Sequence, residues 1–174
     1  MNIESIRVSA CRGAFDKSTY DVNLLHWLEN IRPEIPFNDF AKKQLPAIMP
    51  HGLFDSRRQD SHRVHSGLVQ IDIDSKHQRS NFDPDQALRN CENHKHIVAA
   101  GISCSGSGVY ILIAVHDITR SNHHEKAEKV MQWVEDTLKV VPDAPVSNNL
   151  SSLRFASPYP PYINMDVTPI KFES

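Results

Sequence analysis

Apolar and polar residues alternate along several short stretches of the chain, and a period of two is the pattern of a β-strand. The stretches predicted as strands are residues 6–10, 67–74, 97–103, 109–115 and 153–155, with a further extended segment at 47–49. The clearest is 67–74, in which Leu68, Val69, Ile71 and Ile73 supply the apolar positions. Strands are therefore expected along the whole chain.

Apolar residues at helical spacing predict helices between these strands. They cover residues 24–31, 37–45, 84–91 and 125–140. Ser18 or Thr19 is the expected cap of the first helix, and Asp83 with Pro84 begins the third. The polar stretch 55–65 is expected to be an exposed loop. This order of elements predicts an α+β sandwich of one sheet with helices packed on it.

Composition narrows the class of protein. The chain has 174 residues, which suits a single domain over 1–174, with an N-terminal part (1–44) and a core (45–165). Its 19 Lys and Arg oppose 21 Asp and Glu, so a strongly basic coat for nucleic acid is absent. We expect no membrane span and no secretory signal, and an odd cysteine count of 3 favours a reducing, cytoplasmic setting.

Two aspartates end the clearest predicted strand. Asp72 and Asp74 are two residues apart, so on a strand they project from the same face. Neighbouring carboxylates repel each other unless a cation lies between them, and oxygen ligands suit Mg2+ or Mn2+. We therefore expect both to point from a central strand into a shallow open cleft that holds metal ions. The alternative is an ordinary half-buried strand with Asp on its solvent face.

A small-residue stretch separates the next two predicted strands. Ser103-Cys104-Ser105-Gly106-Ser107-Gly108 can bind phosphate through its backbone N–H groups and hydroxyls. A plain hairpin turn explains the same residues, because no GK[ST] sequence and no helix follow. Arg154, in Leu153-Arg154-Phe155, is significant only if it meets these two features.

Histidine is abundant, with 10 residues, and invites a metal-binding interpretation. His94-Lys95-His96 resembles the HxH motif of rolling-circle nicking endonucleases, although the pair precedes a strand rather than lying within it. His77, His123 and His124 are expected to be exposed to solvent. The cysteines at 11, 91 and 104 are expected to be core thiols rather than a zinc site.

In order along the chain, these motifs resemble the VirE N-terminal-type domains of bacterial mobile elements, within the archaeo-eukaryotic primase (primase-polymerase) superfamily. The resemblance rests on residues 45–48 (LPAI), 52–54 (GLF), 65–74 (HSGLVQIDID), 103–108 and 153–157 (LRFAS). It implies an RRM-like antiparallel or mixed sheet with helices packed on one face. It also implies a nucleotidyltransferase domain of a replication or mobile-element protein, with nucleotide triphosphates, a DNA or RNA template and a helicase or other replication module as partners.

The resemblance also implies roles for residues. Asp72 and Asp74 would hold Mg2+ or Mn2+, and Arg154 would offset developing charge. Nucleotide phosphates would meet Arg154 and the segment after Cys104, that is Ser105, Gly106, Ser107, Gly108 and Tyr110.

Two positions depart from the pattern of active primases. Tyr110 stands where they carry histidine, and no carboxylate lies between Arg154 and Asn164, so that Asp166 is the nearest later candidate. We therefore expect binding with weak or absent primer synthesis. A non-catalytic nucleotide- or nucleic-acid-binding module and the HxH nicking endonuclease remain as alternatives.

Overall fold

The computed structural model describes residues 1–78 and 81–173 of the chain. Its strands are β1 (Arg7–Cys11), β2 (Tyr20–Asn23), β3 (Ala47–Met49), β4 (Gly52–Phe54), β5 (His62–His65), β6 (Leu68–Asp74), β7 (Ile97–Ile102), β8 (Gly108–Ala114), β9 (Arg154–Phe155) and β10 (Tyr162–Ile163). Its α-helices are α1 (Leu24–Asn30), α2 (Asp39–Gln44), α3 (Pro84–Cys91), α4 (His123–Leu138) and α5 (Ala144–Asn148). Short 3-10 turns cover Ile3–Ser5, Gln59–Ser61 and Ser75–His77. The α+β class is therefore confirmed.

Two four-stranded sheets form the body of the protein, where the sequence predicted one. The first has the order β2-β1-β3-β9 and the second β10-β7-β8-β6, and neighbouring strands in both are antiparallel. In the second sheet β8 lies between β6 and β7, which α3 connects, so these elements form a split βαβ unit. β6 is an edge strand, so its predicted central position is wrong.

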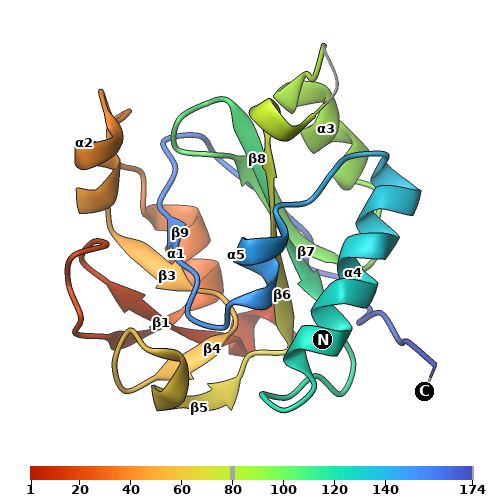
Figure 1. The fold of residues 1–174 in the computed structure, drawn as a ribbon, viewed down its shortest axis with the longest axis horizontal. Helices are drawn as coiled ribbons and strands as arrows, with labels where there is room; N and C mark the ends of the chain where they lie inside the picture. Colours follow the sequence, from red (N-terminus) through yellow and green to blue (C-terminus); the bar gives the residue numbers. More distant parts are fainter. Residues whose placement is uncertain (79–80, 174) are drawn as a thin grey trace.

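The two faces of the second sheet pack against different partners. Val69, Ile71 and Ile73 of β6 belong to a core shared with α3 and α4. Leu68 lies in a second core, together with residues of β1, β3 and α1. Figure 1 shows α3 and α4 on one side of this sheet and the first sheet on the other. Because side chains alternate along a strand, Asp72 and Asp74 share the face of Leu68, toward the first sheet.

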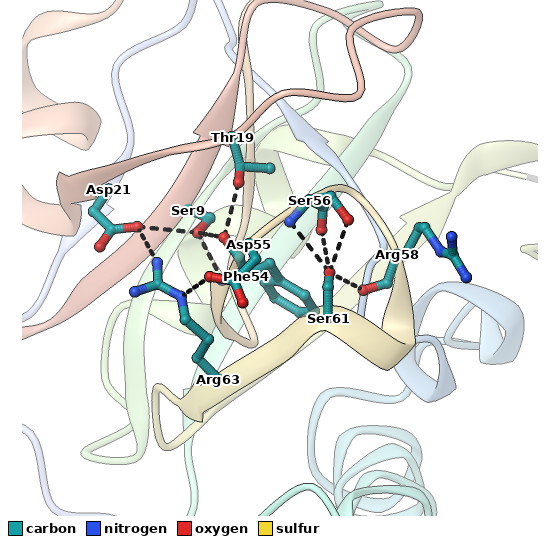
Figure 2. Close-up of polar contacts among 9 residues, drawn as sticks. All are labelled: Ser9, Thr19, Asp21, Phe54, Asp55, Ser56, Arg58, Ser61 and Arg63. Carbon is teal, nitrogen blue, oxygen red and sulfur yellow. Dashed lines mark hydrogen bonds and ion pairs between the residues drawn. The ribbon is translucent and has the colours of Figure 1, made fainter.

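A hairpin of β4 and β5 occupies most of the stretch that was expected to be an exposed loop. Polar contacts join this hairpin to the first sheet (Figure 2). The Phe54 N–H donates to the buried Ser9 hydroxyl (2.8 Å), and the Thr19 hydroxyl donates to the Phe54 carbonyl (2.8 Å). Arg63 forms ion pairs with Asp21 (2.8 Å) and Asp55 (3.0 Å). None of residues 55–65 is buried, so only the strand β5 departs from the prediction. It was missed because polar side chains hold the hairpin in place, and they leave no hydrophobic pattern in the sequence.

The helix boundaries show one error and several successes. Asn23, rather than Ser18 or Thr19, caps α1, and its side chain accepts the His26 N–H. Thr19 is engaged with Phe54 instead, and β2 occupies the residues between. Asp83 caps α3 as expected. No helix within the described part of the chain is long and apolar enough to span a membrane.

Candidate functional site

A small cleft of about 70 Å³ opens where the ends of the two sheets diverge. Five separate segments line it: Lys42 from α2, Asp72 and Asp74 from β6, the serines of the β7–β8 turn, Asp143 just before α5, and Arg154 from β9. Asp72, Asp74, Arg154 and the small-residue turn are thus brought together. Lys42 and Asp143 were not anticipated.

Arg154 links the two sheets at the back of this cleft. It pairs with Ile48 in the first sheet, and its guanidinium reaches Asp72 of the second sheet at 2.5 Å. The Arg154 side chain is 7% exposed and that of Asp72 is 25% exposed. Within the described structure, the Arg154 Nε is buried and has no hydrogen-bond partner. This cation is therefore desolvated and retains a donor that its surroundings do not satisfy.

Tyr110 lies beneath Arg154 rather than in the cleft. Its ring is 4.9 Å from the guanidinium carbon, which is a cation–π distance, and in the β6–β8 register it stands opposite Asp72. Burial raises the pKa of the Tyr110 phenol to about 12, although the charges of Arg154 and Arg32 lower it. Tyr110 consequently supports Arg154 and stays protonated at neutral pH. The predicted direct contact of Tyr110 with phosphate finds no support in its position.

Asp74 forms an ion pair with Lys76, at 2.9 Å between Oδ2 and Nζ. Burial alone would raise the pKa of Asp74, but the hydrogen bonds and charge of Lys76 outweigh it and lower the pKa. The hydrogen bond and charge of Asp74 raise the pKa of Lys76, and the charges of Asp143 and Asp39 add to this. The rim of the cleft therefore has several carboxylates around one exposed ammonium group.

The small-residue turn connects β7 and β8 as a hairpin, in agreement with the simpler of its two interpretations. Ser103, Ser105 and Ser107 form a chain of hydroxyl contacts, each of 3.2 Å, and all three line the cleft. Gly106 has a φ of +78°, and a Cβ there would lie 3.0 Å from the Tyr159 hydroxyl oxygen. A glycine is thus required at the tip, and the hydroxyls remain available to a ligand.

Asp143 is the carboxylate that sequence reasoning missed. Its N–H donates to the Asp72 carbonyl (2.8 Å), which fixes it beside β6. It occupies the N-cap position of α5, yet its side chain makes no capping hydrogen bond. Nearby, the Gln78 amide exchanges two hydrogen bonds with the Val141 backbone (2.7 and 2.8 Å). In the sequence, Asp143 followed by Ala-Pro indicates the start of a helix. That local pattern does not indicate that the helix start lies beside β6.

The donor set of the cleft suits a hard cation. Carboxylate oxygens of Asp72, Asp74 and Asp143, together with serine hydroxyls, are the ligand types that Mg2+ and Mn2+ prefer. In residues 1–78 and 81–173, however, no three such side chains are already arranged around one metal position. Two of the three aspartates are turned away from a shared metal position by ion pairs, Asp72 with Arg154 and Asp74 with Lys76. Asp166 is exposed and lies outside the cleft lining.

The histidine pair of the HxH alternative lies elsewhere. The rings of His94 and His96 both contact Trp133 edge-on, with centroids 5.7 and 5.9 Å away. His96 Nδ1 is also 2.6 Å from the Thr168 carbonyl oxygen. In residues 1–78 and 81–173, no third His, Cys, Asp or Glu side chain is arranged with this pair around one metal position.

A different set of histidines is buried near the start of α4. His51 is fully buried, His123 is 2% exposed, and their ring centroids are 4.5 Å apart. His65 Nε2 lies 3.0 Å from His123 Nδ1. The predicted exposure of His123 is therefore wrong, because α5 and the β4–β5 hairpin cover the first turn of α4.

The family of the chain follows from residues 40–149, which match the model of the BT4734-like, N-terminal domain. The match covers more than half of the 174 residues. The chain belongs to this family. The matched region of this BT4734-like domain includes Lys42, Asp72, Asp74, the serine turn and Asp143, whereas Arg154 follows it. Searches of curated proteins and of solved structures found no match.

Proposed function

We propose that this BT4734-like domain is a primase-polymerase-type nucleotidyltransferase domain whose cleft binds a nucleotide triphosphate together with Mg2+ or Mn2+. The observation that carries the proposal is the convergence of three aspartates, a buried arginine and three serines on one cleft from distant parts of the chain. Polar side chains gathered in this way have no role in the hydrophobic core. The split βαβ unit of the second sheet supports an RRM-like core.

Each group has a defined task in this proposal. Asp72, Asp74 and Asp143 would hold the cation, which when bound supplies positive charge to the nucleotide phosphates and to an attacking hydroxyl. The hydroxyls of the serine turn donate to phosphate oxygens. Arg154 places its positive charge at the back of the cleft, where low exposure strengthens its attraction for anions.

A second candidate function is a non-catalytic nucleotide-binding module on the same fold, and Tyr110 favours it. The resemblance places a histidine of active primases at this position, where it would meet the nucleotide phosphates. Burial holds the Tyr110 pKa at about 12, and its ring lies under Arg154 instead of in the cleft. We therefore propose that this chain alone synthesises primers weakly or not at all, and that it binds nucleotide and nucleic acid.

Calorimetry with Mn2+ and a non-hydrolysable nucleotide triphosphate tests the binding proposal. The informative variant is Asp74→Asn, because Asp74 pairs only with the exposed Lys76 and its loss leaves no buried charge behind. We expect this variant to lose at least tenfold in affinity, with an unchanged thermal midpoint. Asp166→Asn, outside the cleft, is the matched control. Equal affinity in Asp74→Asn and the wild type would refute the site.

Primer extension separates the two candidate functions. Purified protein is incubated with a labelled primer–template, all nucleotides and Mg2+ or Mn2+, with a parallel reaction that lacks the primer. Nucleotide binding without product supports the non-catalytic module. Robust product that disappears in Asp74→Asn supports the transferase and shows that the Tyr110 position does not prevent catalysis.

A further inference from the structure

Three phenylalanines on the first sheet's side of the molecule are exposed to solvent. Phe15 is 64% exposed, Phe40 is 62% exposed and Phe37 is 86% exposed. Phe15 comes from the β1–β2 loop and Phe40 from α2, and their ring centroids are 5.9 Å apart. Large apolar side chains normally enter the core, so a group of exposed aromatic rings points to a binding partner.

The backbone holds these rings in place. The Ala14 N–H donates to the Lys43 carbonyl at 2.7 Å, which joins the β1–β2 loop to α2. A Cβ at Gly13 would lie 2.9 Å from the same carbonyl oxygen, so this close approach requires glycine. The Asn38 side chain caps α2 by accepting the Ala41 N–H at 2.8 Å. The exposed rings are therefore presented by a fixed pair of segments rather than by a free loop tip.

Cations surround the rings although the chain as a whole has a net charge of −2. Arg12 and Lys43 line a cavity of about 250 Å³ beside Phe15, and Lys17 is exposed in the same loop. Asp16 also lines this cavity, but its carboxylate accepts the Ser18 N–H at 2.9 Å. Among the residues that line this cavity, the two cations Arg12 and Lys43 outnumber the single carboxylate Asp16, which is engaged by its own loop.

Helix α2 connects this region to the candidate cleft. Lys43 belongs to the cavity beside Phe15, whereas its neighbour Lys42 lines the cleft with Asp72 and Asp74. Asp39, one turn earlier, contributes to the charge around Lys76 at the rim of the cleft. One side of α2 therefore faces the cleft, and its other side carries Phe40 and Lys43. Figure 1 shows α2 projecting at the edge of the molecule above β3.

We propose that Arg12, Phe15, Phe40 and Lys43, called here the Phe15–Phe40 surface, bind single-stranded nucleic acid. Exposed aromatic rings provide faces on which bases stack, and the flanking cations contact the phosphates, which is how proteins bind single strands without sequence preference. The idea that this surface guides a template strand to the cleft rests on the proposed function. The binding of single strands to the surface does not depend on that function.

Fluorescence anisotropy with a labelled oligothymidine, without metal or nucleotide, tests the proposal. Removing one stacking ring is expected to cost about 5- to 100-fold in affinity. Phe40→Ala should show a loss in this range, and Phe40→Tyr should restore binding because a tyrosine ring also stacks. Lys43→Ala should reduce the dependence of log affinity on log salt by about 0.7.

The controls are Met165→Ala and Lys171→Ala, which change an exposed apolar residue and an exposed cation that do not belong to the surface. Both should bind the oligonucleotide as the wild type does, and thermal melts should show that every variant is folded. Wild-type protein that fails to bind the oligonucleotide, or Phe40→Ala that binds with full affinity, overturns the proposal. Unchanged nucleotide binding in Asp74→Asn, together with loss of oligonucleotide binding in Phe40→Ala, overturns the function proposed for the cleft and supports the surface.

Discussion

Acidification should unfold this protein, because its buried histidines are held in neutral form by their hydrogen bonds. His65 Nδ1 accepts the Gly67 N–H at 3.0 Å, so its proton is on Nε2, which donates to His123 Nδ1 at 3.0 Å. His123 must then carry its own proton on Nε2, which donates to the Ser147 carbonyl at 3.0 Å. A further proton on either ring has to break one of these bonds.

The hydrogen bonds of His51 also hold its ring in the neutral form. Its Nε2 accepts the Gln70 N–H at 3.1 Å, so its Nδ1 carries the proton and donates to the Leu150 carbonyl at 3.2 Å. Burial lowers the pKa of His51 well below its usual value, and the charges that His123 and His65 would acquire lower it further. Burial likewise lowers the pKa of His65 to about 3 and the pKa of His123 by less.

The sign and size of the effect follow from these directions. A histidine in the unfolded chain titrates at about pH 6.5. Below this pH the unfolded chain binds protons that the folded chain does not bind, so the free energy of unfolding decreases as the pH is lowered. At pH 5 each histidine that stays neutral costs about 2 kcal/mol, so His51 and His65 together cost about 4 kcal/mol. That is a large share of the roughly 5–15 kcal/mol that stabilises a typical domain.

Urea unfolding at pH 7 and pH 5 measures the difference directly. The variant His65→Gln keeps an amide donor and acceptor but cannot titrate, so its loss between the two pH values should be smaller by about 2 kcal/mol. The exposed neighbour His124→Gln is the matched control and should keep the wild-type difference. A wild-type free energy of unfolding that is the same at both pH values would refute the reasoning.

Three further substitutions have expected outcomes that urea unfolding can check. Asp72→Ala should cost about 3–5 kcal/mol because it leaves Arg154 buried without its ion pair, and Asp72→Ala with Arg154→Met should recover most of this. Ser9→Ala should cost about 1–3 kcal/mol, since it removes the hydroxyl that satisfies the buried Phe54 N–H. Gln78→Ala should cost about 1 kcal/mol and weaken Mn2+ binding in calorimetry, because its amide joins the segments that carry two of the cleft aspartates.

Local patterns predicted the three long strands of the second sheet and its helices well. β6, β7 and β8 have six or seven residues each, so the partly alternating pattern of β6 and the continuous apolar runs of β7 and β8 are long enough to recognise. The Asp83-Pro84 start of α3 depends on the nearest residues alone and was likewise correct. The placement of Asp72 and Asp74 on one face follows from the strand period, without knowledge of the tertiary structure.

The first sheet could not be predicted in the same way. β3 and β9 agree with the expected extended stretches 47–49 and 153–155, but they pair across more than 100 positions of sequence, and no local pattern shows that they are neighbours. Asp143 was missed for the same physical reason, because its place in the cleft depends on a backbone hydrogen bond to Asp72 in a distant strand. His123 looked like an exposed first-turn residue, and it is buried only because other segments fold over it.

The charges of the cleft explain why its carboxylates are not already gathered around a metal position. Asp72 is neutralised by Arg154 and Asp74 by Lys76, so the repulsion that a cation would relieve is relieved by the protein itself. A nucleotide triphosphate alone meets about as many carboxylates as cations there and gains little net attraction. In the proposed function, a triphosphate that arrives with a divalent cation would offer phosphates to Arg154 and Lys42, and the carboxylates would hold the metal. The ion pairs of the free cleft would then exchange partners, so we expect binding to depend on both ligands together.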